Sequence, residues 1–303
     1  MNVLSLFDGI SCGQIALERA SITVDNYFAS EIDKHAIKVT QYNYPNTIQI
    51  GDVAKIDCSS LPKIDLLLGG SPCTNFSFAG NRKGMVTKDN EEITNLARYL
   101  QLKAEGFEFQ GQSYLFWEYV KILNEVKPTY FLLENVKMAK KWQKVISDTL
   151  GCEPILINSA LVSAQNRKRL YWTNIPNVTQ PEDKGIVLND ILSLNEMSYR
   201  YWGTNLIHKL NNNLYARKDY YIFENINGKV RSLLSNNSTI NKQKIKYDDK
   251  VRLLTPLEWE RLQTIPDLYT QLLSNTARYR VLGNSWTVDV IVHIMQGLKI
   301  NQV

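Results

Sequence analysis

Long apolar runs, clustered cysteines and clustered histidines are all missing from this 303-residue chain. No stretch approaches the length of a membrane span, and the N-terminal residues lack the basic start of a secretory signal. The four cysteines form no C-x-x-C pair and the three histidines are scattered, so we expect neither a disulfide framework nor a metal site. With 44% hydrophobic and 21% charged residues, we expect an intracellular protein with one large domain or a large and a small one.

Acidic residues are sparse in one part of the chain. Residues 200–252 contain eleven Lys/Arg and four Asp/Glu, a local charge of +7 in a chain of net charge +5, so the remainder carries −2. A basic segment in a near-neutral protein favours a polyanionic partner. A solvated lysine-rich surface has the same composition, so charge alone leaves both interpretations open.

The first half of the sequence alternates between strand and helix patterns. The expected strands are Asn2–Leu6, Tyr27–Ser30, Ile48–Ile50, Ile64–Leu68 and Thr129–Leu133. The expected helices are Gln14–Ala20, Asp33–Tyr42 and Glu118–Val126, with a further helix over Glu91–Ala104. This alternation predicts a mainly parallel sheet in a doubly wound α/β domain.

Acidic residues follow four of these strands directly. They are Asp8, Glu31, Asp52 and Glu134. Glu31 lies 22 residues after Gly9, close to the spacing at which an acid accepts hydrogen bonds from a nucleotide ribose. The turn at Gly9–Gly13 lacks the G-x-G-x-x-G pattern, which favours a nucleoside without phosphates over a dinucleotide. A single acid of this kind is usually a loop residue or a helix cap, but four in succession indicate a binding edge.

A thiol follows the fourth strand. Gly69 and Gly70 end the apolar run, Pro72 stiffens the backbone, and Cys73 begins a loop of glycines and polar residues. A lone cysteine is usually a small buried hydrophobe. Its position at the carboxyl end of a predicted parallel strand favours a nucleophile instead.

Taken together, these motifs resemble the DNA (cytosine-5) methyltransferase family over most of the chain. The matching motifs, in the family's order, are Phe7-Asp8-Gly9 with Gly13, Ser30-Glu31, Gly51-Asp52-Val53, Pro72-Cys73 with Phe76-Ser77, Glu134-Asn135-Val136, Gln165-x-Arg167-x-Arg169, Arg252-Leu253-Leu254-Thr255-Pro256 with Glu258, Arg261, Gln263 and Pro266-Asp267, and Gly283-Asn284-Ser285 with Val288. Ser71 stands where the family commonly has proline. Ser71 before Pro72-Cys73 and Trp286 after Gly283-Asn284-Ser285 resemble the corresponding residues of the de novo branch known from animals. The short basic region in the middle of the chain resembles that of bacterial and phage enzymes.

The resemblance implies an α/β Rossmann-like domain that binds S-adenosylmethionine, releases S-adenosylhomocysteine and uses no metal. It implies that Cys73 attacks cytosine C6, that Glu134 contacts N3, and that Arg167 and Arg169 hold the base carbonyl or a nearby phosphate. One of these two arginines could instead belong to a salt-bridged loop. The implied cofactor-binding residues are Phe7, Asp8, Gly9, Gly13, Glu31, Ile32, Asp52, Val53, Pro72, Asn284, Ser285 and Trp286.

The resemblance also divides the chain by role. Residues 1–172 form the catalytic and cofactor-binding domain, 173–251 the target-recognition region, and 252–303 a hinge and a segment returning to the catalytic domain. Residues 85–112 resemble an insertion of phage-type members, and we expect a helical flap there.

Double-stranded DNA is the expected partner, in the cytoplasm of a bacterial or phage-infected cell. A companion restriction endonuclease is compatible with this assignment. No feature of the sequence indicates which DNA sequence is the target or which oligomeric state the protein has. Two alternatives stay open: a transfer RNA cytosine-5 methyltransferase, and a catalytically inactive relative that only binds DNA.

Overall fold

The computed structural model describes residues 1–72, 76, 84–193, 222–223, 225–235, 243–247 and 250–302. The predicted nucleophile Cys73 and most of the basic segment 200–252 lie outside the described residues. The chain forms two compact units. The first contains residues 1–157, 168–180 and 292–303, and the second contains residues 158–167 and 181–291.

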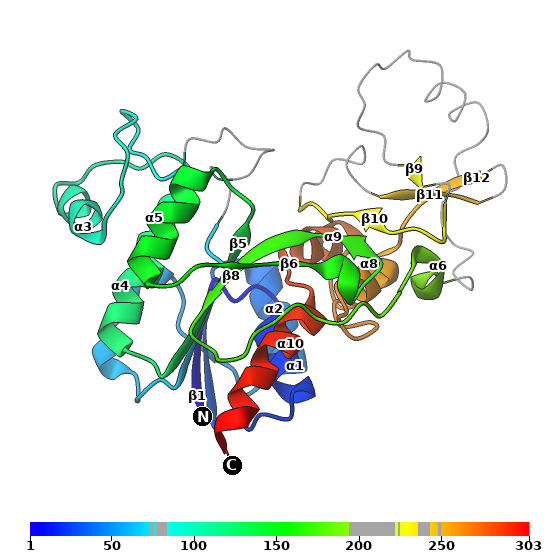
Figure 1. The fold of residues 1–303 in the computed structure, drawn as a ribbon, viewed down its shortest axis with the longest axis horizontal. Coiled ribbons are helices and arrows are strands. Elements are labelled where there is room, and N and C mark those ends of the chain that lie inside the picture. Colours follow the sequence, from blue (N-terminus) through cyan, green and yellow to red (C-terminus); the bar gives the residue numbers. More distant parts are fainter. Residues whose placement is uncertain are drawn as a thin grey trace. The chain divides into compact units, whose positions relative to one another are not determined.

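A mixed sheet forms the centre of the first unit (Figure 1). Its strands, in spatial order, are β3 (Ile48–Gln49), β2 (Asn26–Ser30), β1 (Asn2–Leu6), β4 (Leu66–Gly69), β5 (Tyr130–Val136), β8 (Lys168–Thr173) and β6 (Ile155–Asn158). The pairs from β3 to β5 are parallel, whereas β5 and β8 are antiparallel. Strands β1 and β4 are almost wholly buried, as expected for parallel strands covered on both faces.

Helices cover both faces of this sheet. In Figure 1, α4 and α5 lie on one face and α1 and α2 on the other. The helices of the unit are α1 (Cys12–Arg19), α2 (Lys34–Asn43), α3 (Leu96–Ala104), α4 (Phe116–Val126) and α5 (Lys140–Leu150), with short 3-10 helices η1 (Val53–Lys55), η2 (Cys58–Ser60), η3 (Ser113–Leu115) and η6 (Gln296–Gln302). This arrangement confirms the predicted α/β class.

Two predicted element boundaries are wrong by three residues or more, and most of the others differ from the observed bounds by one or two residues, as in β4, α1 and α4. Strand β5 continues through Val136 instead of ending at Leu133, because β8 pairs alongside it and places Glu134 opposite Tyr171. Helix α3 begins at Leu96 instead of Glu91. The Asn95 side chain accepts a hydrogen bond from the backbone N–H of Arg98 at 2.9 Å and caps the helix there.

Several residues of the segment 85–112 contribute to the first unit's core. Met85, Ile93, Tyr99 and Leu102 are all buried in the same apolar cluster as the strands and α4. The carboxylate of Glu118, which is buried on α4, accepts hydrogen bonds from the Tyr99 hydroxyl and the Lys103 ammonium. One side of the segment therefore packs against the core, and its role as a flap that tunes DNA binding or turnover stays a prediction.

The second unit combines small sheets with helices. Its strands are β7 (Gln165–Asn166), parallel to β10 (Val230–Arg231), and β11 (Lys244–Tyr247), which lies between β9 (Ile222–Phe223) and β12 (Lys250–Leu253). Its helices are α6 (Leu188–Ile191), α8 (Pro256–Leu262), α9 (Asn275–Asn284) and the 3-10 helix η4 (Ser159–Leu161). Helix α10 (Val288–Met295) begins in this unit and ends in the first.

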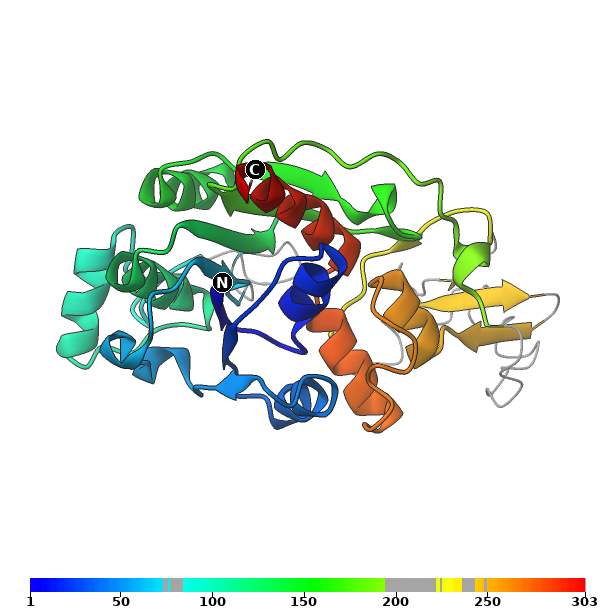
Figure 2. The same ribbon diagram turned by 90° about the horizontal axis from the view of Figure 1, so that it is seen from below.

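The compact units and the predicted ranges divide the chain differently. Residues 252–291 belong to the second unit, and within the predicted return segment only residues 292–303 belong to the first. Figure 2 shows this C-terminal piece beside the chain that follows β8, where a Cβ atom on Gly297 would lie 2.3 Å from the Pro176 carbonyl oxygen. The predicted ranges divide the chain by role in recognition and catalysis, whereas the compact units follow from contacts between residues, so the two divisions need not coincide.

None of the helices in the described ranges has the length and apolar character needed to cross a bilayer. In the same ranges, no three His, Cys, Asp or Glu side chains come together as a set that could hold a metal ion.

Candidate functional site

The turn after β1 leaves an open backbone surface. Phe7, Gly9 and Ser11 all have positive φ, between 56° and 61°. A Cβ atom built on Gly9 would meet no other atom within 4 Å. Gly13, in contrast, packs so closely that a Cβ atom would lie 2.7 Å from the Tyr27 hydroxyl. The close packing of α1 against β2 explains the glycine at position 13, and the open space over Gly9 is available to a ligand.

Glu31 follows β2 and is held by backbone N–H groups. Its Oε2 accepts a hydrogen bond from Gly9 at 2.8 Å, and its Oε1 accepts from Ile32 and Asp33, each at 2.8 Å. A carboxylate offers about four acceptor positions, so one remains for a ligand hydroxyl. The neighbouring Ile32 side chain is 67% exposed, the largest exposed fraction among the large apolar residues described.

Asp8 lies behind this turn. Its Oδ1 accepts a hydrogen bond from the Tyr27 hydroxyl at 2.8 Å, and its Oδ2 accepts from the Ser11 hydroxyl. Burial raises the pKa of Asp8 to about 6, with a smaller contribution from the negative charge of Glu31, while hydrogen bonds from Ser11, Ser5 and Tyr27 oppose the increase. Asp8 therefore titrates close to neutral pH.

Asp52 follows β3 at the same edge of the sheet. Its Oδ1 accepts a hydrogen bond from Ala54 N–H at 3.0 Å and caps η1, whose Val53 side chain is buried. The Ser30 hydroxyl donates to the Gly51 carbonyl oxygen at 2.7 Å and joins the ends of β2 and β3. The carboxyl ends of neighbouring parallel strands meet at one edge, so Asp8, Glu31 and Asp52 share it.

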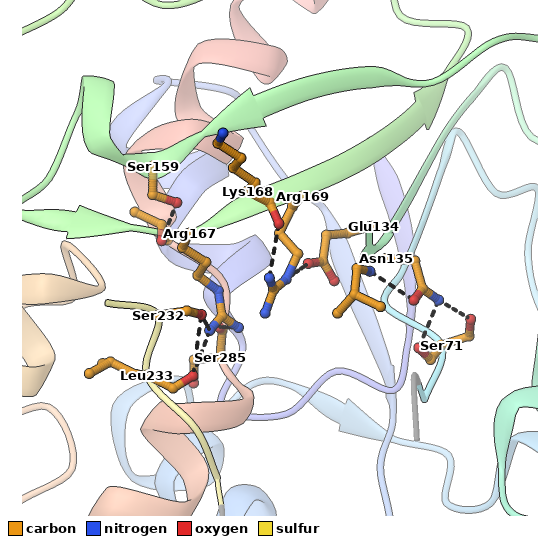
Figure 3. Close-up of polar contacts among 12 residues, drawn as sticks. Ser71, Glu134, Asn135, Ser159, Arg167, Lys168, Arg169, Ser232, Leu233 and Ser285 are labelled. Carbon is orange, nitrogen blue, oxygen red and sulfur yellow. Dashed lines mark hydrogen bonds and ion pairs between the residues drawn. The ribbon is translucent and has the colours of Figure 1, made fainter. Parts of the chain in front are cut away.

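Glu134 and Arg169 form an ion pair near the end of β5. The Nε of Arg169 lies 2.9 Å from Oε1 of Glu134, and the two side chains are 15% and 11% exposed. Figure 3 shows the Arg169 side chain directed at the Glu134 carboxylate. The antiparallel register, in which Val136 lies opposite Arg169, brings the two residues together.

Asn135 ties β5 to the segment that leads to Cys73. Its Nδ2 donates to the Ser71 carbonyl oxygen and to the Ser71 hydroxyl, both at 3.1 Å (Figure 3). Both residues are buried, and Asn135 Oδ1 also accepts from Val136 N–H at 2.8 Å. Ser71 is thus fixed two positions before Cys73, with Pro72 between them.

We expect Asn135→Ala to lower the free energy of unfolding by about 1–3 kcal/mol, because the buried Ser71 carbonyl and hydroxyl would lose their donor. Urea denaturation measures this change. Ser71→Ala is the matched control and should cost less, because it removes one of the two acceptors and leaves the carbonyl bonded. Equal losses for both variants would contradict this account of the contact.

Arg167 has different partners from Arg169. Its guanidinium is buried and donates to the Ser232 hydroxyl at 3.2 Å and to the carbonyl oxygens of Leu233 at 3.1 Å and Ser285 at 3.0 Å (Figure 3). These partners all belong to the second unit. Of the two predicted arginines, Arg169 meets Glu134, whereas Arg167 links segments of the second unit.

Asn284, Ser285 and Trp286 also belong to the second unit. Asn284 is exposed at the end of α9, Trp286 is partly exposed, and the Ser285 hydroxyl donates to the Val281 carbonyl oxygen at 2.7 Å. Their assignment to the cofactor stays a prediction.

A buried glutamine pair was missed by the sequence analysis. Gln165 Nε2 donates to Gln263 Oε1 at 3.1 Å, and Gln165 Oε1 accepts from Leu233 N–H at 2.8 Å. Gln263 Nε2 donates to the Ser285 carbonyl oxygen at 3.0 Å. Both glutamines are fully buried. Both glutamines stand in the motifs that resemble the family. Their pairing could not be predicted, because they are 98 positions apart in the sequence.

Comparisons with known proteins agree with these motifs. A family model described as C-5 cytosine-specific DNA methylase matches residues 1–299. An orphan methyltransferase of Bacillus phage rho11s, M.Rho11sI, is 34% identical over 209 residues, which are 64% of this chain and 37% of that relative. The chain thus spans little more than a third of that protein's length. The type II methyltransferase M.NlaX of Neisseria lactamica is 28% identical, with 98% of this chain and 96% of that relative covered.

A solved structure shares the fold. The Entamoeba histolytica methyltransferase EhMeth superposes with a TM-score of 0.73 at 17% identity, covering 100% of this chain and 99% of that one.

Proposed function

Because this chain belongs to the C-5 cytosine-specific DNA methylase family, we propose that it transfers a methyl group from S-adenosylmethionine to C5 of cytosine in double-stranded DNA. The observation that carries the proposal is the ion pair between Glu134 on β5 and Arg169 on β8, next to the Asn135 contact that fixes Ser71 before Cys73. An acid near the end of β5 and a fixed residue two positions before a cysteine suit the activation of a pyrimidine.

The residues at the edge of the sheet fit S-adenosylmethionine. Glu31 keeps an acceptor for a ribose hydroxyl, the exposed Ile32 offers an apolar surface for adenine, and the second carboxylate oxygen of Asp52 can accept from its amine. The open backbone at Gly9 admits the methionine part. When bound, this cofactor supplies a methyl group on a sulfonium cation. We propose that Phe7, Gly13, Val53 and Pro72 complete the site in the first unit, while a role of Asn284–Trp286 in cofactor binding stays a separate prediction.

Asp8 should make cofactor binding depend on pH. Its pKa of about 6 lies above the ordinary value of 3.8, so the carboxyl gains its negative charge as pH rises through 6. The sulfonium cofactor is attracted to the charged form, so its affinity should rise from pH 5 to pH 7 and then level off. Equilibrium dialysis measures the dissociation constants.

Two controls isolate the effect of Asp8. S-adenosylhomocysteine lacks the sulfonium charge and should show a weaker pH dependence, and Asp8→Asn should flatten the curve for S-adenosylmethionine. An unchanged curve in the Asp8→Asn variant would assign the pH dependence to another group.

In the proposed reaction, the Cys73 thiolate forms a bond to cytosine C6, and the displaced electron pair becomes available at C5. Glu134 contacts N3, where charge develops, and Arg169 holds the Glu134 carboxyl in place. After C5 has accepted the methyl group it loses its proton to a base, the C5–C6 double bond returns, and the thiolate leaves. Cytosine must leave the duplex stack before Cys73 can reach C6.

We propose that residues 173–251 set the target sequence. Residues 200–252 carry a local charge of +7, which favours binding to phosphates. Within the second unit, Arg167 and Gln165 connect residues 232–233 to the segments around Gln263 and Ser285. We place the reaction in the cytoplasm of a bacterial or phage-infected cell, in keeping with the sources of the phage and bacterial relatives.

Transfer of tritium from labelled S-adenosylmethionine tests the proposal. Duplex DNA should become labelled at cytosine C5, and transfer RNA should not. Labelling of transfer RNA alone would make the protein an RNA methyltransferase. Binding of DNA without any labelling would make it an inactive relative.

A further inference from the structure

One tryptophan contacts residues on both sides of the stretch 77–83, which follows Cys73. Trp142 lies in the first turn of α5, directly after β5 in the chain, and is 4% exposed. It belongs to the apolar core of the first unit together with Phe76, Met85 and Met138. The helix therefore holds its indole in a fixed place within the core.

Gly84 packs against the Nε1–Cε2–Cζ2 edge of this indole. A Cβ atom built on Gly84 would lie 1.9 Å from Cε2 of Trp142 and 2.4 Å from Cζ2. Gly84 also has φ of +75°, a conformation that favours glycine. A side chain at position 84 would therefore collide with this buried indole.

Phe76 contacts the same side chain from the other end of the stretch. The ring centroids of Phe76 and Trp142 are 6.3 Å apart, with an angle of 59° between the ring planes. This is within the range of favourable tilted aromatic pairs. Phe76 is 3% exposed and lies three positions after Cys73.

We propose that Trp142 is a positioning residue for the loop that carries Cys73, acting through Phe76 and Gly84; this rests on the proposed function. Asn135 holds Ser71 before the thiol, and Trp142 holds Phe76 and Gly84 after it. Asn135 and Trp142 come from one continuous piece of chain, β5 and α5, which also carries Glu134. The same piece thereby sets the position of the acid and of the loop that bears the nucleophile.

Trp142→Phe provides the first test. Phenylalanine keeps a ring in the core but lacks the atoms that contact Gly84. A misplaced nucleophile costs rate even when substrates still bind, so we expect kcat for methylation of duplex DNA to fall about 10- to 100-fold. The rate of covalent capture by 5-fluorocytosine DNA should fall by the same factor. The KM for S-adenosylmethionine should stay within about twofold.

Trp117→Phe is the matched control. Trp117 is a fully buried tryptophan of the same core, on α4, and its indole N–H has no hydrogen-bond partner among the described residues. Its replacement should lower thermal stability and leave kcat and the capture rate unchanged.

Gly84→Ala provides an independent test from the other side of the contact. Its methyl group collides with the Trp142 indole, so kcat should again fall while cofactor affinity is kept. The double variant Gly84→Ala/Trp142→Phe should be no slower than the slower single variant, because the smaller ring makes room for the methyl group.

Three outcomes decide between the interpretations. A normal capture rate in Trp142→Phe, or a parallel loss of cofactor affinity, would overturn the positioning role and leave a merely structural tryptophan. Multiplicative losses in the double variant would show that Trp142 does not act through Gly84. Absence of tritium transfer by the unaltered protein would instead refute the proposed function.

Discussion

Replacing Cys73 with serine is expected to abolish methyl transfer and covalent capture by 5-fluorocytosine DNA. A serine hydroxyl near its ordinary pKa is a far poorer nucleophile than a thiolate, so attack on C6 should stop. Fluorine at C5 cannot leave as a proton does, so the unaltered enzyme should stay attached to DNA after methylation. The adduct should require S-adenosylmethionine and survive denaturing electrophoresis.

The other three cysteines provide the controls. Cys12 is buried, burial raises the pKa of Cys152, and burial together with Glu125 raises the pKa of Cys58 to about 12. Cys58 and Cys152 are therefore protonated and weakly nucleophilic at neutral pH. Cys12→Ser, Cys58→Ser and Cys152→Ser should each keep the adduct. An adduct in the Cys73→Ser variant, or attachment at another cysteine, would overturn the mechanism.

Glu134→Gln is expected to slow the reaction by about 10²- to 10⁴-fold, the usual contribution of a general acid or base. An amide cannot supply a proton at N3, and it also loses the charge that pairs with Arg169. Single-turnover rates at saturating cofactor and DNA isolate this step from binding. Affinity for S-adenosylmethionine should change little.

Glu118→Gln is the matched control for Glu134. Glu118 is a fully buried acid of the same unit, bonded to Tyr99 and Lys103. Its replacement should destabilise the fold and leave the single-turnover rate close to normal. A full rate in Glu134→Gln would remove Glu134 from the chemistry and leave its ion pair with Arg169 as a structural contact.

The sequence predicted those parts of the fold that depend on local pattern. The strand at Asn2–Leu6 was predicted with its observed bounds, because a short apolar run ends at a glycine turn. The family and the α/β class were confirmed. The end of β5 was missed because its partner β8 lies far along the chain, and the start of α3 was missed because the cap at Asn95 was not recognised.

The candidate site shows the same limit. Glu31 was predicted from its spacing, and two of its backbone donors, Ile32 and Asp33, are adjacent in sequence, but the third, Gly9, depends on how the turn after β1 folds back. Arg167 and Arg169 share one motif, and only the pairing of β8 with β5 gives Arg169 the ion pair with Glu134. The contacts of Asn135 with Ser71 and of Trp142 with Gly84 join residues more than fifty positions apart, beyond the reach of a local pattern.

The interleaving of the two units has a consequence for synthesis on the ribosome. The chain passes from one unit to the other after residues 157, 167, 180 and 291. When residues 1–157 have emerged, β8 has not yet been made, so the strand that bears Glu134 has an open edge. Exposed edges pair readily with other chains. The nascent protein therefore exposes the edge of β5 to aggregation until residues 168–173 cover it.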